Sequence, residues 1–290
     1  MTRLIDDIRR DIDSVDRQLH DLLMKRADLA DEIGRIKKQS KTQVVHPDRE
    51  AALIRKILSR HKGKFPSAAI IAVWRQIVGA LSTIQGENLQ VVVCCPDDGS
   101  QTGYINLELT KNYFSSVLPV KRTASPLAVL SMIREAEATF GILPWPEDGT
   151  GDEAWWRFMM DESGAHGLRV IGRLPFANAD ETMPPEHRAL IVAKIPFADS
   201  GEDNSFLVID LESDVSRSLM VSEAEKSNFK PVSVYNSKSE TQMTNFMLLE
   251  VEGFVEEHDP RIAQLRTNLG GMHTRIQVIG GYPVPPVLKS

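Results

Sequence analysis

Residues 5–36 read IDDIRRDIDSVDRQLHDLLMKRADLADEIGRI, and the spacing of apolar residues in this stretch decides the first part of the fold. The apolar residues recur at intervals of three and four, which places them on one face of a helix. The spacing predicts an apolar residue at position 26, where the chain has arginine. A guanidinium on an inward face needs an anionic partner, because its burial alone is costly. The stretch therefore predicts a long helix that binds an anion inside a bundle. The apolar positions are Ile5, Ile8, Ile12, Val15, Leu19, Leu22, Leu29, Ile33 and Ile36.

Two shorter helices are predicted after this one. The first helix, over residues 3–38, is about 50 Å long at about 1.5 Å per residue. A second helix begins at His46-Pro47 and ends near His61, and a third runs from Pro66-Ser67 to Gln85. Helices of such unequal length leave part of the first without a neighbour. We therefore expect a homodimer of interlocked three-helix units, formed through the N-terminal helices.

The rest of the chain has a different pattern. Short apolar runs that indicate strands alternate with helical segments between residues 91 and 195, which predicts an α/β layered structure. Residues 206–280 follow the order βαββαβ, which is ferredoxin-like. The predicted fold class is thus multi-domain, α followed by α/β. The predicted domains are residues 1–88, 89–202 and 203–290.

Composition narrows the function classes. The chain has 290 residues and a net charge of -6, which argues against a nucleic-acid partner. The N-terminus has no signal-peptide core, and the sequence gives no apolar run that we expect to span a membrane. The two cysteines, Cys94 and Cys95, are adjacent and fit no disulfide framework. We expect a cytoplasmic protein.

Four polar residues lie on or beside the apolar faces of these helices. Lys37 follows Arg26 by eleven residues, so it returns to within about 20° of the same face and lies about 16 Å along the axis. This separation leaves room for a small dianion. Glu50 is in phase with the apolar residues of the second helix, so it faces inward, with Arg49 beside it. Gln85 lies at the edge of the third apolar face.

Simpler interpretations exist for several of these residues. Lys37 and Arg49, taken singly, are typical solvated surface cations, and Gln85 alone is typical of a helix end. Arg9 lies about 25 Å from Arg26 along the same helix and is rotated by about 100°. It cannot reach the same ligand within one chain, but an antiparallel dimer brings it to the partner's site.

These segments resemble the all-helical AroQ-type chorismate mutases over about residues 4–87. The resemblance rests on Ile8–Asp16, Leu22–Arg26, Ile33–Lys37, Asp48-Arg49-Glu50, and Trp74–Val78 followed by Gln85. It implies that the substrate is chorismate and that no metal or cofactor takes part.

The resemblance also implies a role for each site residue. Arg26 and Arg9 of the partner subunit hold the two carboxylates, and Lys37 and Gln85 bond the ether oxygen. Glu50 takes the ring hydroxyl and Arg49 supports the site. Leu81 stands where a small polar substrate-binding residue is usual, with Ser82 as its neighbour, and His46 stands where an acidic residue is common.

The remaining two thirds are similar to the prephenate dehydratase and ACT regulatory domains to which such units are fused in bacteria. The Thr-Arg-Phe motif of the dehydratase overlays His187-Arg188-Ala189, so the catalytic hydroxyl is missing. We expect this part to be an inactive, shortened remnant. Residues 216–218 and 236–239 replace the ACT motifs that help to bind phenylalanine.

Three functions follow as hypotheses. The first is a chorismate mutase with degenerate dehydratase-like and ACT-like domains. The second is a bifunctional mutase and dehydratase, which the retained Arg188 supports. The third is a regulatory protein that senses an aromatic amino acid effector and has little or no catalysis.

Overall fold

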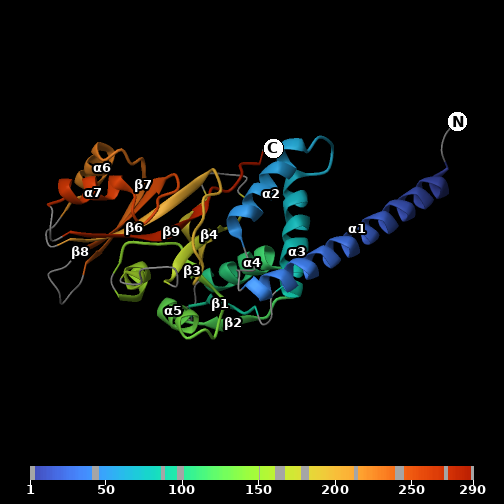
Figure 1. Cartoon of the computed structure of the whole chain (residues 1–290), viewed down its shortest axis with the longest axis horizontal. Coiled ribbons are helices and arrows are strands. Elements are labelled where there is room, and N and C mark those ends of the chain that lie inside the picture. Colours follow the sequence, from blue (N-terminus) through green and yellow to red (C-terminus); the bar gives the residue numbers. More distant parts are fainter. Residues whose placement is uncertain are drawn as a thin grey trace.

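The computed structural model describes residues 4–40, 46–85, 89–96, 101–149, 151–160, 167–177, 183–211, 215–238, 245–270 and 274–288. Its N-terminal part consists of helices α1 (Ile5–Ser40), α2 (Pro47–Arg60) and α3 (Ser67–Gln85), which confirms the three predicted helices. The predicted domain boundary at residue 88 lies outside the described residues. Figure 1 shows that the N-terminal portion of α1 projects away from the body and that its C-terminal portion lies against α3.

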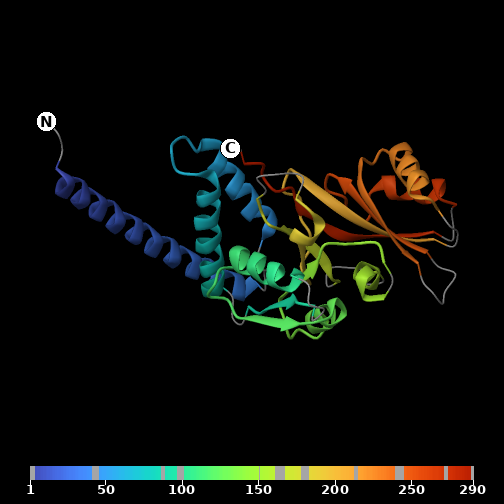
Figure 2. The ribbon, with the colours of Figure 1, turned by 180° about the vertical axis from the view of Figure 1, so that it is seen from behind.

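Among the described residues, the apolar face on the projecting part of α1 is left uncovered. Its apolar residues are exposed, with Leu4 at 71%, Ile12 at 53% and Leu22 at 63%. The view from behind shows the same overhang (Figure 2). Burial on α1 begins only at Ala30. At Gly34 the helix approaches α3 so closely that a Cβ atom would lie 3.0 Å from the Cα of Gln85. A side chain at this crossing would require α3 to move by a few tenths of an ångström.

Helix α2 attaches the helical part to the C-terminal part of the chain. Its buried face consists of Pro47, Ala51, Ile54 and Ile57. From the same helix, Arg55 donates hydrogen bonds to the backbone carbonyl oxygens of residues 200, 202 and 284, at 2.9, 2.7 and 3.1 Å. The helical part is therefore fixed to the sheet by polar contacts as well as by packing.

The middle part contains the alternating strands and helices that the sequence predicts. Strand β1 is parallel to β2 and β3, whereas β5 is antiparallel to β3 and β4. Strand β2 covers residues 120–123, and the Trp-rich helical segment over residues 151–159 is a 3-10 helix with a kink at Ala154. The elements are β1 (Val91–Cys94), α4 (Thr102–Phe114), β2 (Val120–Thr123), α5 (Pro126–Arg134), β3 (Phe140–Pro144), η1 (Gly151–Met159), β4 (Arg169–Leu174), η2 (Pro185–His187) and β5 (Ala189–Ala193).

The C-terminal part has the predicted βαββαβ order. Its four strands lie in the order β9-β6-β8-β7, and every neighbouring pair is antiparallel. Helices α6 and α7 cover one face over a core that includes Leu207, Met220 and Leu265. The opposite face packs against the Trp-rich segment of η1. The elements are β6 (Asp203–Leu211), α6 (Arg217–Lys226), β7 (Pro231–Lys238), β8 (Asn245–Glu252), α7 (Pro260–Asn268) and β9 (Arg275–Pro283).

The two groups of strands form one continuous nine-stranded sheet, which crosses the domain division predicted at residue 202. The connection is a short parallel pairing of β4 with β9, at Val170 and Gly280. Gly280 has φ +106, and a Cβ there would lie 2.1 Å from the carbonyl oxygen of Val170. Only glycine allows both this backbone conformation and this approach. Gly280 is therefore the residue at which the two strand groups become one sheet.

Large aromatic residues and both cysteines lie inside this structure. Trp155 and Trp156 are fully buried in the core beneath the sheet, and Cys94 and Cys95 are buried free thiols. Helix α3 is long and apolar enough to cross a membrane by length and composition alone. Core helices of soluble proteins pass the same test, and α3 packs against α1 and α4, so this feature assigns no membrane.

Candidate functional site

A cavity of about 320 Å³ lies between α1, α2 and α3, and we call it the helical cavity. It brings together six of the seven residues that the sequence proposes for the site. Helix α1 contributes two cations, α2 contributes a cation and a carboxylate, and α3 contributes the leucine and the amide. These residues are Arg26, Lys37, Arg49, Glu50, Leu81 and Gln85.

The negative charge of Glu50 acts on both cations of α1, Arg26 and Lys37. Burial lowers the pKa of Arg26 below its ordinary value, and the negative charge of Glu50 opposes this change. Burial also lowers the pKa of Lys37; Arg49 lowers it further and Glu50 raises it. The cavity thus holds three cationic side chains and one anionic side chain, which leaves it positively charged.

Glu50 has a buried partner that the sequence analysis did not assign to the site. Arg75 of α3 donates from Nη1 to Oε2 of Glu50 at 2.7 Å, and the two side chains are only 5% and 13% exposed. Burial by itself lowers the pKa of Arg75, but the influence of Tyr113 and Glu50 outweighs it and the pKa is raised. A pair so well shielded from water holds the Glu50 carboxylate in one orientation.

Arg75 also connects the helical cavity to the middle part of the chain. Its Nε and Nη2 donate to the backbone carbonyl oxygen of Tyr113 on α4, at 3.2 and 3.1 Å. The guanidinium carbon lies 3.5 Å from the centroid of the Tyr113 ring and 5.4 Å from that of Phe176. The middle part thus supplies the acceptor and the aromatic rings that hold Arg75. The sequence contains a signal for this residue: Arg75 lies four residues from Ile71 and from Gly79, which are both buried. A charged residue on that buried face of α3 needs a partner.

The remaining lining residues differ in polarity. Leu81 is buried and lines the cavity, as does the adjacent Ser82, whose hydroxyl donates to the backbone carbonyl oxygen of Val78 at 3.0 Å. His46, at the start of α2, also contributes to the lining. The cavity therefore retains a hydroxyl beside the leucine, although that hydroxyl is used within α3.

Arg9 is the seventh predicted site residue, and within this chain it lies outside the helical cavity. It is on the projecting part of α1, 72% exposed, and it pairs with Asp6 at 3.2 Å. This position agrees with the distance expected from the sequence. Its role in a second subunit's site remains a prediction.

The helical cavity can bind an anion without a metal. Guanidinium and ammonium groups and an amide point into a space the size of a small organic molecule. Among the described residues, no group of three or more His, Cys, Asp or Glu side chains is arranged to hold a metal ion.

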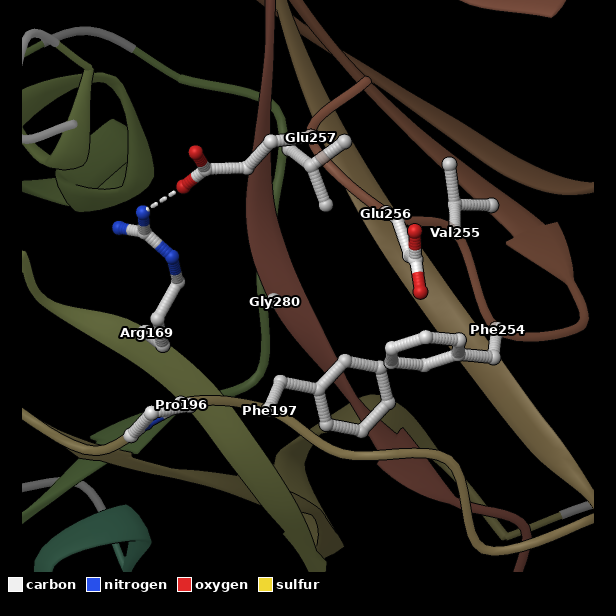
Figure 3. A pocket seen from close by; sticks show the side chains of 9 residues that line it. Arg169, Pro196, Phe197, Phe254, Val255, Glu256, Glu257 and Gly280 are labelled. Carbon is white, nitrogen blue, oxygen red and sulfur yellow. Dashed lines mark hydrogen bonds and ion pairs between the residues drawn. The ribbon is translucent and has the colours of Figure 1, made fainter. Parts of the chain in front are cut away.

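A second cavity, of about 330 Å³, lies where β4 meets β9 (Figure 3). Arg169 reaches across it to Glu257, and the two form an ion pair. The rings of Phe197 and Phe254 pack together on the other side, with centroids 5.2 Å apart. Because Arg169 and Glu257 satisfy each other, this cavity offers a ligand less charge than the helical cavity does.

Parts of residues 216–218 and 236–239, which the sequence analysis compares with ACT motifs, lie together around a third cavity, lined by Ser216, Asn236 and Ser237. A residue of the middle part bonds to them. Asp148 accepts a hydrogen bond from the backbone N–H of Asn236 at 2.8 Å and forms an ion pair with Arg217. Residue 239 of the second motif lies outside the described residues.

Two comparisons with known proteins concern the helical part of the chain. Residues 8–86 match the family model of chorismate mutase type II. A bifunctional chorismate mutase/prephenate dehydratase of Aquifex aeolicus is 34% identical over 83 residues, which is 27% of this chain and 23% of that protein. The match therefore spans about a quarter of the relative's length.

Two solved prephenate dehydratases resemble part of this chain at low identity. Prephenate dehydratase from Streptococcus mutans has a TM-score of 0.44 and 11% sequence identity to this chain. The superposition covers 67% of this chain and 97% of the dehydratase. Prephenate dehydratase from Arthrobacter aurescens, solved with L-Phe, has a TM-score of 0.45 and 12% sequence identity. The superposition covers 69% of this chain and 93% of that dehydratase. Likeness of this degree carries no functional argument. The match to the family model of chorismate mutase type II is confined to the helical part, residues 8–86.

Proposed function

We propose that this protein is a chorismate mutase that rearranges chorismate to prephenate in the helical cavity. The observation that supports the proposal most is the convergence of Arg26, Lys37, Glu50 and Gln85 from three helices on one space of about 320 Å³. Membership of residues 8–86 in the chorismate mutase type II family supports it independently.

The chemistry of the rearrangement fits such a cavity. The reaction is pericyclic and needs no nucleophile and no proton transfer. It needs the dianion held in a compact conformer with its reacting carbons in contact. It also needs hydrogen-bond donors at the ether oxygen, which gains negative charge as the carbon–oxygen bond breaks. In this proposal Arg26 binds a carboxylate, and Lys37 and Gln85 bond the ether oxygen. Glu50 accepts from the ring hydroxyl, and Arg49 and Leu81 complete the substrate contacts.

The active form in this proposal is a homodimer. The exposed apolar face of α1 needs a covering surface, and a second copy of α1 offers one of the same length and pattern. In an antiparallel arrangement, Arg9 of the partner subunit binds the second carboxylate. A cytoplasmic location is part of the same proposal.

The C-terminal part is proposed to be ACT-like. Its βαββαβ order and its strand order β9-β6-β8-β7 support this assignment. Amino-acid regulation does not follow from the architecture, because Asp148 already bonds to the segment around Asn236. An aromatic amino acid effector therefore stays a secondary hypothesis, tested by calorimetry with phenylalanine, tyrosine and tryptophan.

The first experiment measures the loss of chorismate absorbance for the wild type, for Arg26→Ala and for Arg35→Ala. Arg35 is the matched control, because it is an exposed arginine of α1 that pairs with Asp31. We expect Arg26→Ala to lower kcat/KM at least about a hundredfold, the cost of one charge-assisted contact in a dry site. Arg35→Ala should stay close to wild type. Near-normal turnover by Arg26→Ala would overturn the assignment.

The bifunctional alternative has a separate test. Arg188 is retained and lines a cavity, but His187 and Ala189 flank it in place of the Thr and Phe of the dehydratase motif. Purified prephenate is supplied to the protein and phenylpyruvate is measured. We expect none above the uncatalysed rate, because the assisting hydroxyl is missing; enzymatic formation would establish the second activity.

A further inference from the structure

Helix α3 belongs both to the helical cavity and to the surface on which the middle part packs. It lines the cavity with Gln85, and it lies beside α4 of the middle part (Figure 2). Ile54 of α2 and Ile71 of α3 are buried in the same core as Phe140 of β3. The helices that form the cavity therefore share one hydrophobic core with the middle part.

The approach of α3 to α4 is very close at Gly79. A Cβ atom on Gly79 would lie 2.5 Å from the backbone carbonyl oxygen of Phe114 and 2.8 Å from the Cβ of Ser115. These neighbours are backbone or lie next to it, so they cannot move aside as the end of a flexible side chain can. A side chain at Gly79 would therefore push α4 away from α3.

Arg75, one helical turn before Gly79, connects this packing to the cavity. On one side its guanidinium donates to the backbone carbonyl oxygen of Tyr113, at 3.2 and 3.1 Å. On the other side it donates to Oε2 of Glu50 at 2.7 Å. The guanidinium is planar and its donors have fixed directions, so both acceptors together determine where it lies. A displacement of the Tyr113 carbonyl oxygen therefore displaces the guanidinium and, with it, the Glu50 carboxylate.

The connection is shielded from water. Arg75 is buried, and the ring of Tyr113 covers its guanidinium. Burial raises the pKa of the Tyr113 hydroxyl, the charge of Arg75 opposes this change and Glu50 adds to it. The three side chains thus interact as one group. Breaking a buried ion pair leaves a charge without compensation, so Glu50 has few alternative orientations while Arg75 is held in place.

We infer that the middle part positions the carboxylate of the mutase site: α4 holds Arg75, and Arg75 holds Glu50. Arg75 and Tyr113 are positioning residues, because neither is among the described residues that line the helical cavity. This role rests on the proposed function. It gives the dehydratase-like part a task in the mutase that requires no dehydratase chemistry.

A misplaced Glu50 has a characteristic effect on the kinetics. In the proposed function Glu50 bonds the ring hydroxyl of chorismate, and that hydroxyl is present both before and during the rearrangement. Losing the contact weakens binding of the ground state and of the transition state alike, which raises KM and leaves kcat nearly unchanged. Partial unfolding does the reverse, because it lowers the number of active molecules and so the apparent kcat, but not KM.

The test measures chorismate turnover by the full-length wild type, Arg75→Met, Glu50→Gln and the double variant. We expect Arg75→Met to raise KM at least about tenfold, the cost of one charge-assisted contact. In the presence of Glu50→Gln it should add less than about twofold, because Arg75 acts through that carboxylate. Gln76→Met is the matched control and should keep the wild-type KM. Gln76 is the next residue on α3, and its amide donates to the carbonyl oxygen of Lys111 on α4 at 3.5 Å.

Gly79→Ala is a second route to the same result. It changes none of the residues that line the cavity, and its added Cβ separates α3 from α4. We expect it to raise KM as well, and to have little effect when combined with Glu50→Gln. Thermal melting of each variant verifies that it is folded under the assay conditions.

The outcomes separate this role from the proposed function. A wild-type protein without turnover overturns the proposed function and the positioning role with it. Wild-type turnover with a KM that neither Arg75→Met nor Gly79→Ala changes overturns the positioning role alone. It is also overturned if the losses are confined to kcat, or if those of Arg75→Met and Glu50→Gln are fully additive, since Arg75 would then act on folding only.

Discussion

At the scale of single residues, Arg75 shows how a charge inside an apolar helix is accommodated. It bonds to Glu50 in the helical cavity and to the Tyr113 carbonyl oxygen in the middle part. Removing one partner of a buried ion pair leaves the other charge uncompensated. Glu50 is therefore stabilised in the orientation in which it faces the cavity.

We predict that Arg75→Met lowers the free energy of unfolding by about 3 kcal/mol, the cost of breaking one buried pair. The double variant Arg75→Met, Glu50→Gln should lose less than the sum of the two single variants, because the unpaired charge is gone. Urea denaturation of the three variants measures this. Strict additivity would show that the pair contributes no coupling.

Lys37 gives a prediction for pH. Burial and Arg49 lower its pKa in the free protein, so it loses its proton at a lower pH than an ordinary lysine. The charged form, which the proposal requires, is present below that pKa and is lost as the pH rises through it. We expect kcat/KM to fall on the alkaline side, and kcat to fall at higher pH because a bound dianion raises the pKa again. In Lys37→Arg the alkaline fall should disappear; if it persists unchanged, another group causes it.

At the scale of elements, α1 carries an apolar face along its whole length but finds a neighbour only near its C-terminal end. The exposed side chains begin at Leu4 and continue through Met24. A contiguous exposed apolar face of this kind marks an interaction surface, so the projecting part of α1 favours a partner.

We predict that Ile12→Glu with Leu19→Glu converts the proposed dimer to a monomer and abolishes the proposed mutase turnover. The reason is that two charges would have to be buried in the interface. Sedimentation velocity and the chorismate assay measure the two effects. Arg17→Glu, an exposed change on another face of α1, is the control and should remain dimeric. A wild-type protein that sediments as a monomer yet turns over chorismate would contradict the dimer.

A mixing experiment tests Arg9 directly. Arg9→Ala and Arg26→Ala should each be nearly inactive, because each lacks one carboxylate contact at both sites. After unfolding and refolding together in equal amounts, half the dimers are mixed, and each mixed dimer has one intact site. We therefore expect about a quarter of the wild-type activity. Absence of recovery in verified mixed dimers would place Arg9 outside the partner's site.

At the scale of the whole molecule, the strands of the middle and C-terminal parts join at one short pairing. Gly280 has a positive φ, and its backbone lies against Val170. Any side chain at this position meets the carbonyl oxygen of Val170. The continuity of the nine-stranded sheet therefore depends on a residue without a Cβ.

We predict that Gly280→Val lowers the free energy of unfolding by about 3 kcal/mol or more, because backbone strain and a steric clash add. Gly270→Ala is the control, since Gly270 also has a positive φ but has open space around it, and it should cost about 1 kcal/mol. Chemical denaturation compares the two. Equal losses would show that the clash is relieved at no cost.

Much of this architecture follows from the sequence because local patterns dictate it. Apolar residues three and four apart predict α1, α2 and α3, and the βαββαβ order of the last part is visible in its runs of β-branched residues. The same periodicity identifies Arg26 and Glu50 as inward-facing charges. Less local features were missed: the 3-10 geometry of η1 depends on how Trp155 and Trp156 pack beneath the sheet.

The sequence by itself determined the helical unit, the inward-facing positions of Arg26 and Glu50, and the excess of apolar surface on α1, because each depends on helical periodicity. Only the tertiary structure decided which carboxylate Arg75 pairs with, that the Tyr113 carbonyl oxygen and ring hold it, and that β4 and β9 merge two groups of strands into one sheet. The cavity that Arg173 and Glu250 line likewise exists only in three dimensions, since these two residues are far apart in the chain. Such contacts depend on the relative positions of elements, which residue spacing along one helix or strand does not encode.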